Sequence, residues 1–406
     1  MPRPVHVAVL DHTAEPGGAE LALVRVLEGL DPHRVTPVVV LFADGPLAAR
    51  VRALGHEVVV VPLAGDVLGA GRATGPAAAL HPRRVLAGAS FLRRLVATLR
   101  RLDVDVVHTT SLKADLAGAL AAPLARRPLV WHVHDRLAPD YLPARTARLL
   151  QSLARRVPHT VVANSEATAA TLPGARRLTV VHPGLAPEQV APAARTRQPA
   201  GPPVVVMVGR ISPTKGQLVL VRAARRVADA RPDVCVRIVG DPAFGADDYA
   251  EQVRAEVRAL SLQDHVELVG FRPDPRHELD RASVAVHAAT VPEPFGQVVT
   301  EAMAAGVPVV ATRGGGVDEI VRTDADAATG LLVRPGDPDA LAAAVLDVLD
   351  DPERALARAA RAHADVTRRF LAAASAEGLT RVWEQAARST PHLAPHPVPH
   401  PARSRR

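Results

Sequence analysis

The sequence predicts an α/β protein built from two parallel-sheet domains that face each other across a cleft. Three observations support this: short valine-rich runs alternate with longer helical stretches, an irregular segment interrupts the alternation near the middle, and the alternation then begins again. Continuous apolar strands separated by helices are typical of a parallel sheet covered on both faces. The chain has 406 residues, enough for two domains of about 200 residues that each bury a substantial core.

The first half, residues 1–186, is predicted to form the N-terminal domain. Helices are expected over residues 19–30 and 47–53. The segment 187–203 is rich in Pro, Ala and Gly and has no hydrophobic period, so it is predicted to be the linker. The strands expected in this half are the runs VHVAVL, VVVLF, EVVVVP, VDVVHTT, LVWHVHD, TVVAN and LTVVHPG.

Residues 204–370 repeat the alternation and are predicted to form the second domain. Helices are expected over 217–230 and 249–260, and two more near the end over 352–370 and 372–387. The strands expected in this half are VVVMVGR, VCVRIVG, VELVGF, SVAVHAA, VPVVAT and GLLVRPG. Residues 389–406 are too rich in proline to order, and we expect a disordered tail rather than a metal site from their three histidines.

Charge and cysteine content exclude several classes of protein. The formal net charge is +7, but the basic residues are spread along the chain without a nucleic-acid motif, so nucleic-acid binding is not expected. The single cysteine, Cys235, rules out an internal disulfide and argues against structural zinc. The first apolar run is shorter than that of a signal sequence, and no run reaches the ~20 apolar residues of a membrane span. A cytoplasmic protein is expected.

Residues 291–310 combine a loop, a helix and a strand and carry the strongest functional signal. Two prolines and Gly296 keep the helix from starting before residues 295–298, so its free N–H groups point out of a loop and form an anion site. Glu293 and Glu301 bracket this helix start, on the order of 10 Å apart along the axis. That is too far for the ~5 Å of a retaining glycosidase's carboxylate pair. We interpret them as holding two ends of one elongated ligand.

Two cations follow the first strand of the second half. Arg210 ends the strand, and Lys215, one of two lysines in the chain, precedes Gly216. An arginine for bidentate contact and a lysine as a compact charge suit a diphosphate. In the first half, Gly17 and Gly18 lie between a strand and a helix, where glycine allows the backbone to approach a ligand closely.

Two pairs of residues resemble metal ligands. His132 and His134 point to the same side of a strand at period two, but no third ligand is evident, so no metal site is expected. Asp103 and Asp105 match a metal-binding D-x-D pattern, yet they precede a strand and are interpreted as structural.

The segment 82–101 is predicted to form a basic helix. Its arginines lie largely away from an apolar side formed by Val85, Ala89, Leu92, Val96 and Leu99. A packed helix with a charged outer face is the favoured interpretation. The alternative is peripheral contact with the anionic inner face of a membrane.

The stretch from Glu293 to Glu301, EPFGQVVTE, together with AMAAGVPVVAT and GGGVDEI, resembles the E-x7-E signature of retaining glycosyltransferases of the GT-B fold, family 4 (group 1). That fold has two Rossmann-like domains facing a cleft. Its last helix crosses back to the first domain, which implies that residues 371–388 pack on the N-terminal domain.

The resemblance implies a role for each candidate residue. Glu293 would contact hydroxyls of the donor sugar, and Glu301 would bind the ribose. The GR-x4-KG element resembles the one whose cations neutralise the leaving diphosphate, and the position of His134 is similar to that of a histidine that hydrogen-bonds the donor sugar. The implied catalytic residues are His134, Glu293, Arg210 and Lys215, and the implied donor-binding residues are Gly17, Gly18, Arg210, Lys215, Phe295, Gly296, Gln297, Val298 and Glu301.

These features predict a retaining glycosyltransferase that moves a sugar from a nucleoside diphosphate donor to a glycan, a lipid-linked acceptor or a small molecule. Because Arg210, Lys215 and the helix start supply positive charge, neither a metal nor a cofactor is expected. Two alternatives stay open: a nucleotide-sugar epimerase of the same fold, and a non-catalytic nucleotide-sugar sensor.

Overall fold

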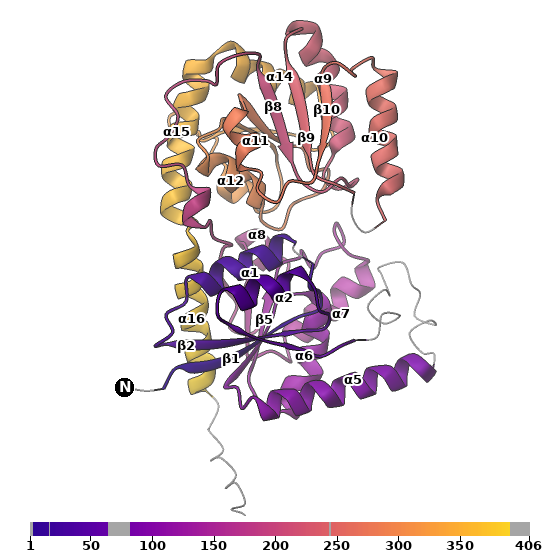
Figure 1. Ribbon diagram of the computed structural model, residues 1–406, viewed down its shortest axis with the longest axis vertical. Helices are drawn as coiled ribbons and strands as arrows, with labels where there is room; N and C mark the ends of the chain where they lie inside the picture. The colour runs from indigo at the N-terminus through magenta and orange to yellow at the C-terminus, as the bar shows by residue number, and fades with distance from the viewer. Residues whose placement is uncertain (1–2, 16, 64–81, 243–244, 390–406) are drawn as a thin grey trace, which may run out of the picture.

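The protein is described by a computed structural model over residues 3–15, 17–63, 82–242 and 245–389; the expected tail, 390–406, lies outside these ranges. Within them the chain forms two sheets, of seven and six strands, and every pairing between named strands is parallel. Figure 1 shows the two sheets in separate domains, one above the other. The prediction of two parallel-sheet domains is confirmed.

The first sheet has the strand order β3-β2-β1-β4-β5-β6-β7. Its central strands are buried along their length because helices cover both faces, which explains the continuous apolar runs of the sequence. The strands are β1 (Val5–Asp11), β2 (Val35–Leu41), β3 (Glu57–Val60), β4 (Val106–Thr109), β5 (Leu129–Val133), β6 (Thr160–Ala163) and β7 (Thr179–Val180). The helices are α1 (Gly18–Glu28), α2 (Pro46–Ala53), α5 (Pro82–Arg101), α6 (Leu112–Leu124), α7 (Ala144–Ala154) and α8 (Glu166–Ala169).

The second sheet has the order β10-β9-β8-β11-β12-β13 and follows a short 3-10 helix, η1 (Pro187–Gln189). Its strands are β8 (Val204–Val208), β9 (Cys235–Val239), β10 (Val266–Gly270), β11 (Val284–His287), β12 (Val309–Thr312) and β13 (Leu331–Val333). Its helices are α9 (Gln217–Ala230), α10 (Asp247–Ala259), α11 (Arg276–Arg281), α12 (Gln297–Ala304), α13 (Val317–Ile320) and α14 (Pro338–Asp350).

Each sheet reverses its strand order next to its first strand, between β1 and β4 in one and between β8 and β11 in the other. Loops that leave the carboxyl ends of such strands diverge, and ligands of open α/β sheets bind in the crevice between them. The loops at these two points carry Gly17 and Gly18, Arg210 and Lys215, and Glu293. The topology therefore brings together residues that lie far apart in the sequence.

Two long helices join the domains at the end of the chain. In Figure 1, α15 (Pro352–Arg369) runs beside the second domain and α16 (Ala372–Arg388) beside the first, where it packs on α1, β1, β4 and β5. The chain crosses between domains at Leu185, whose backbone N–H donates to Phe370 O (2.8 Å) and whose carbonyl accepts from Ala372 N (2.9 Å). The buried indole of Trp383 then donates to His108 Nδ1 over 3.2 Å.

The basic helix α5 packs along only part of its length. Its buried side chains include Phe91, Leu95 and Leu99, whereas Val85 is 53% exposed and Leu86 is 71% exposed. The apolar side expected from the sequence is therefore correct near the C-terminus and wrong at Val85 and Ala89, which are exposed because the first turns of the helix reach out beyond the strands (Figure 1). In the part of the chain that the structure describes, no helix has both the length and the apolar character needed to cross a membrane.

Candidate active site

An ion pair lies where the second sheet reverses its strand order. Lys215, in the loop after β8, places Nζ 2.5 Å from Oε1 of Glu293, in the loop after β11. Nε2 of His287, the last residue of β11, lies 3.7 Å from the same oxygen. Burial alone would raise the pKa of Glu293, but the Lys215 ammonium and His287 outweigh it and hold that pKa well below its usual range. Glu293 is thus a largely buried, charged carboxylate.

The residue after Lys215 has to be glycine for a steric reason. Gly216 has a φ of +80°, and a Cβ built on it would lie 1.9 Å from the carbonyl oxygen of Ala288. Only glycine lets the Lys215 loop lie so close to the end of β11. This contact sets Lys215 beside Glu293.

The helix expected to form an anion site is α12, which begins at Gln297 after Gly296, a residue with a φ of +111°. Phe295 is 2% exposed, and its ring packs against His182 and Phe370 with centroids 5.6 and 5.4 Å away. The Phe295 side chain therefore anchors the loop, and only its backbone is free to serve a donor. Val298 is partly buried on the first turn.

Glu301 is contacted by the first domain and by the segment that follows it. Arg25 of α1 places Nη2 2.8 Å from Glu301 Oε1, and Gln189 Nε2 donates to the same oxygen over 3.0 Å. Arg25 Nη1 also donates to Gln297 Oε1 (3.2 Å), and Gln297 Nε2 donates to the carbonyl of Gly18 (2.9 Å). Gly18, Gln297 and Glu301, all predicted from the sequence, therefore meet around one arginine.

Arg210 and Gly17 flank these groups. Arg210 is exposed directly after β8, and its carbonyl accepts a 2.9 Å hydrogen bond from Gln217 Nε2, which fixes the loop. Gly17 precedes α1, where a Cβ would lie 2.5 Å from Glu20 Oε2. Burial and the nearby Asp11 carboxylate raise the pKa of Glu20 to about 7.

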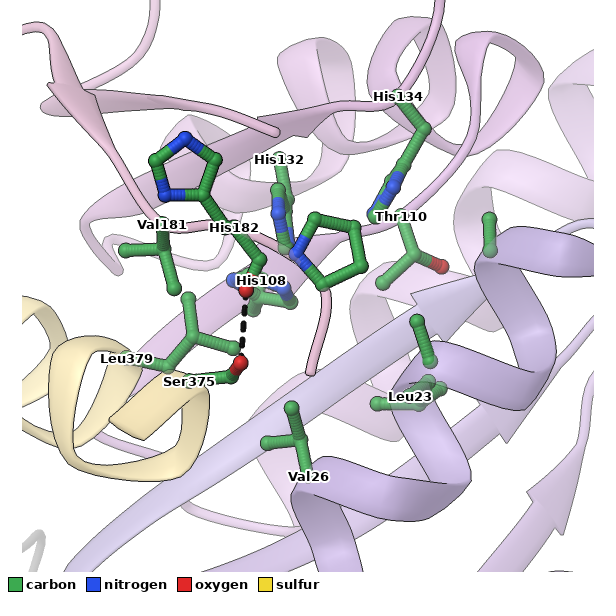
Figure 2. A pocket seen from close by; sticks show the side chains of 13 residues that line it. Leu23, Val26, His108, Thr110, His132, His134, Val181, His182, Ser375 and Leu379 are labelled. Carbon is green, nitrogen blue, oxygen red and sulfur yellow. Dashed lines mark hydrogen bonds between the residues drawn. The ribbon is translucent and has the colours of Figure 1, made fainter. Parts of the chain in front are cut away.

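His134 lines a pocket with three other histidines, His108, His132 and His182 (Figure 2). His108 comes from β4 and His132 from β5, and α1 and α16 supply Leu23 and Leu379. The rings of His132 and His134 lie 4.0 Å apart between centroids. Burial lowers the pKa of His134 to about 4 and that of His132 well below its usual value. A neutral His134 can give or accept a hydrogen bond without adding charge.

The two aspartates that resembled metal ligands have other partners. Asp103 accepts from Arg127 and Asp105 from both Arg3 and the backbone N–H of His6, which supports a structural role. Among the described residues, no group of three or more His, Cys, Asp or Glu side chains could hold a metal ion.

Sequence reasoning missed Arg25, Gln189 and His287. Arg25 is the sole basic residue in the otherwise apolar or acidic helix α1, and His287 ends an apolar strand. Both are unusual choices for a helix or strand that packs on a core, and this was the available signal. Gln189 lies in a short turn that gave none.

Both halves of the chain match known protein families. Residues 193–364 match the family described as "Glycosyl transferases group 1", and residues 16–189 match "Glycosyltransferase Family 4". The chain is 32% identical over 288 residues to the D-inositol 3-phosphate glycosyltransferase of Kribbella flavida, covering 64% of this chain and 67% of that one. Over 314 residues it is 32% identical to the protein of the same name from Kineococcus radiotolerans, covering 70% and 72%.

Solved structures resemble the whole described chain. HepE of Anabaena in complex with UDP and glucose superposes with a TM-score of 0.78 at 28% identity, covering 93% of this chain and 99% of that one. Sucrose-phosphate synthase of Thermosynechococcus elongatus shares the fold, with a TM-score of 0.75 at 21% identity over 95% and 100% of the two chains.

Proposed function

The chain belongs to the group 1 glycosyltransferases of family 4, and on that premise we propose that it transfers a hexose from a nucleoside diphosphate sugar with retention of configuration and without a metal ion. It is a glycosyltransferase with the GT-B fold, as the resemblance implied. The observation that supports the proposal is the largely buried Lys215–Glu293 ion pair on one side of the α12 N-terminus, with Glu301 on the other.

The proposed roles follow from charge and position. Lys215, Arg210 and the first N–H groups of α12 would stabilise the departing diphosphate, electrostatic work that a metal ion does in other transferases. Glu293 would hold hydroxyls of the sugar, and Glu301 would hold the ribose. Because Arg25 and Gln189 occupy Glu301 in this structure, the nucleotide must displace or join them.

The donor and acceptor are chosen by testing. HepE was solved in complex with UDP and with UDP-glucose, and its sequence is 28% and 29% identical to this chain in the two comparisons. UDP-glucose is therefore the first donor to offer. D-inositol 3-phosphate, the acceptor in the names of several relatives, is the first acceptor.

The experiment is a thermal-shift panel of UDP, GDP, ADP and TDP in EDTA, followed by transfer assays with the sugar of the stabilising base. A nucleotide at 100 times its dissociation constant adds about 2.7 kcal/mol of stability. We expect one base to stabilise the protein, and its labelled sugar to appear on an acceptor. Conversion of the donor sugar to its epimer without acceptor would favour the epimerase, and binding without turnover would favour the sensor.

We also propose that the N-terminal domain docks on an anionic membrane, where lipid-linked acceptors lie. Helices α5, α6 and α7 contribute to one buried cluster on one face of the first sheet. They contain a single acidic residue, Asp115, which is buried. Apart from Phe271, the large apolar side chains exposed among the described residues all lie on these helices: Val85, Leu86, Leu116, Leu120, Leu124 and Leu149. Exposed leucines beside arginines suit anionic lipid.

Co-sedimentation with vesicles tests this contact. We expect binding to vesicles that contain phosphatidylglycerol and none to pure phosphatidylcholine. The triple variant Leu116→Ser, Leu120→Ser, Leu124→Ser should lose vesicle binding and keep nucleotide binding. Equal sedimentation with both lipids, or an unaffected triple variant, contradicts the proposal.

A further inference from the structure

A second set of contacts joins the two domains, away from Glu301. The carboxylate of Glu319, in α13 of the second domain, accepts from the backbone N–H groups of Glu166 (3.0 Å) and Ala167 (2.6 Å) at the start of α8 in the first domain. His182 Nε2 lies 3.2 Å from the same carboxylate. Burial opposes the charged form, but His182 and the two N–H groups outweigh it, so the pKa of Glu319 is lowered.

The same short helix holds the loop that carries Glu293. Ser165 Oγ donates to the carbonyl of Pro294 over 2.5 Å, and Thr168 Oγ1 donates to it over 3.2 Å. Pro294 is the residue directly after Glu293. Its carbonyl belongs to the second domain, whereas both of its side-chain donors belong to the first.

The second domain holds the other side of this loop. The N–H of Gly316 donates to Glu293 O over 2.9 Å. Gly315 has a φ of +72°, and a Cβ on it would lie 1.8 Å from that carbonyl. The backbone of Glu293 and Pro294 is therefore clamped between α13 on its own domain and α8 on the other.

We propose that Ser165, Thr168 and Glu319 are positioning residues that make the geometry of the Glu293 loop depend on contact between the domains. If the domains separate, the Pro294 carbonyl loses both side-chain donors and the α8 amides lose Glu319. Only the closed arrangement then holds Glu293 in one place beside Lys215. The loop would be ordered only when the first domain is in contact with it, which limits donor cleavage in a molecule whose domains have separated.

The inference rests on the proposed function only for its kinetic consequence, because its structural part can be measured without substrate. Hydrogen exchange of residues 290–297 and 165–169 is compared in the wild type, in Ser165→Ala with Thr168→Val, and in Glu319→Gln. We expect the double variant to exchange about two- to tenfold faster in residues 290–297, the range set by losing a net hydrogen bond. Glu319→Gln should speed exchange at Glu166 and Ala167.

Asp337→Ala is the matched control. Asp337 caps α14 by accepting from the N–H of Ala340 over 2.9 Å, within the second domain and away from α8. It should lower stability as an N-cap loss does, about 1 kcal/mol or a fivefold change in the folding equilibrium, without changing exchange in residues 290–297. Ser165→Thr keeps the hydroxyl, so residues 290–297 should exchange as slowly in this variant as in the wild type.

Kinetics supply the second measurement. In the double variant kcat should fall at least tenfold, with donor KM and nucleoside diphosphate affinity within about twofold of the wild type, because Lys215 and α12 belong to the second domain alone. Unchanged exchange in residues 290–297, or a control that speeds it equally, overturns the positioning role. If the wild type transfers no sugar at all, the proposed function fails. The exchange measurement still tests whether Ser165, Thr168 and Glu319 position the Glu293 loop.

Discussion

The side chains of Lys215 and Glu293 depend on each other. Each lies in a loop that leaves an adjacent strand, and each is only partly exposed, at 23% and 13% of the side chain. A largely buried charge is costly without its partner, so each of these side chains lowers the cost of burying the other.

The first prediction concerns this pair. Lys215→Ala should lower kcat by at least 10²-fold, the scale on which one preorganised donor acts. It should also raise the pKa of Glu293, because burial then acts without the ammonium that opposes it. Steady-state kinetics with the donor that the transfer assays identify measures the first effect. Near-normal turnover would mean that Lys215 does not touch the diphosphate.

Glu20 carries a prediction about pH. Its pKa is raised from 4.5 to about 7 in the folded protein, so the folded state holds a proton that the unfolded state releases between these values. Stability should therefore fall as pH rises from about 4.5 to about 7. Glu20→Gln, which mimics the protonated form, should be more stable than the wild type at pH 8 by on the order of 1–3 kcal/mol and no more stable at pH 4.

Urea unfolding at the two pH values measures this difference. Glu28→Gln, an exposed change on the same helix, is the control and should show no comparable pH dependence. A Glu20→Gln variant that is less stable than the wild type at pH 8 would mean that the charged carboxylate is needed there.

At the scale of elements, the sequence predicted helices well where proline and glycine mark their ends. The expected ranges 82–101 and 217–230 coincide with α5 and α9, and α12 begins at Gln297 within the expected 295–298. Which part of α5 would be covered could not be predicted, because that depends on how far the helix extends past the strands. Local sequence determines which residues share one side of a helix, but not how far the sheet extends along that side.

The loop between β8 and α9 gives the element-scale prediction. Gly216→Ala introduces both a left-handed alanine and a Cβ 1.9 Å from Ala288 O. Gly336→Ala introduces the left-handed alanine alone, since Gly336 has a φ of +73° and no atom within 4 Å of its Cβ. Gly336→Ala should cost about 1–2 kcal/mol, and Gly216→Ala at least about 2 kcal/mol more.

Denaturant midpoints of the two variants measure this difference. Gly216→Ala should also weaken nucleotide binding, because the loop must move away from β11 and carry Lys215 with it. Equal losses of stability in Gly216→Ala and Gly336→Ala would show that the loop accommodates the added Cβ beside Ala288 without a cost in stability.

At the scale of the whole molecule, the contacts between domains were the least predictable part. Arg25 and Glu301 are 276 positions apart, and Ser165 lies 129 positions before Pro294. No local pattern links such residues, because their approach is set by the strand order of both sheets and by the crossing at Leu185. Local sequence pointed to Gly18, Glu293 and Glu301. It did not point to the contacts that Arg25 and α8 make with the other domain.

These contacts connect the two domains at two places, one on each side of the α12 N-terminus. On one side, Arg25 of the first domain holds Glu301, and on the other, α8 holds the loop beside Glu293. The α12 N-terminus lies between them. A nucleoside diphosphate sugar laid across this N-terminus would have its ribose beside Glu301 and its sugar beside Glu293.

The most direct test of this arrangement is calorimetric titration of the stabilising nucleoside diphosphate, in EDTA, into the wild type, Glu301→Ala and Glu293→Gln. The ribose is present in the ligand and the sugar is absent, so we expect metal-free binding to the wild type, affinity within about threefold for Glu293→Gln, and a loss of at least about tenfold for Glu301→Ala. Binding that appears only with Mg²⁺, or that is lost by Glu293→Gln and kept by Glu301→Ala, would contradict the proposed site.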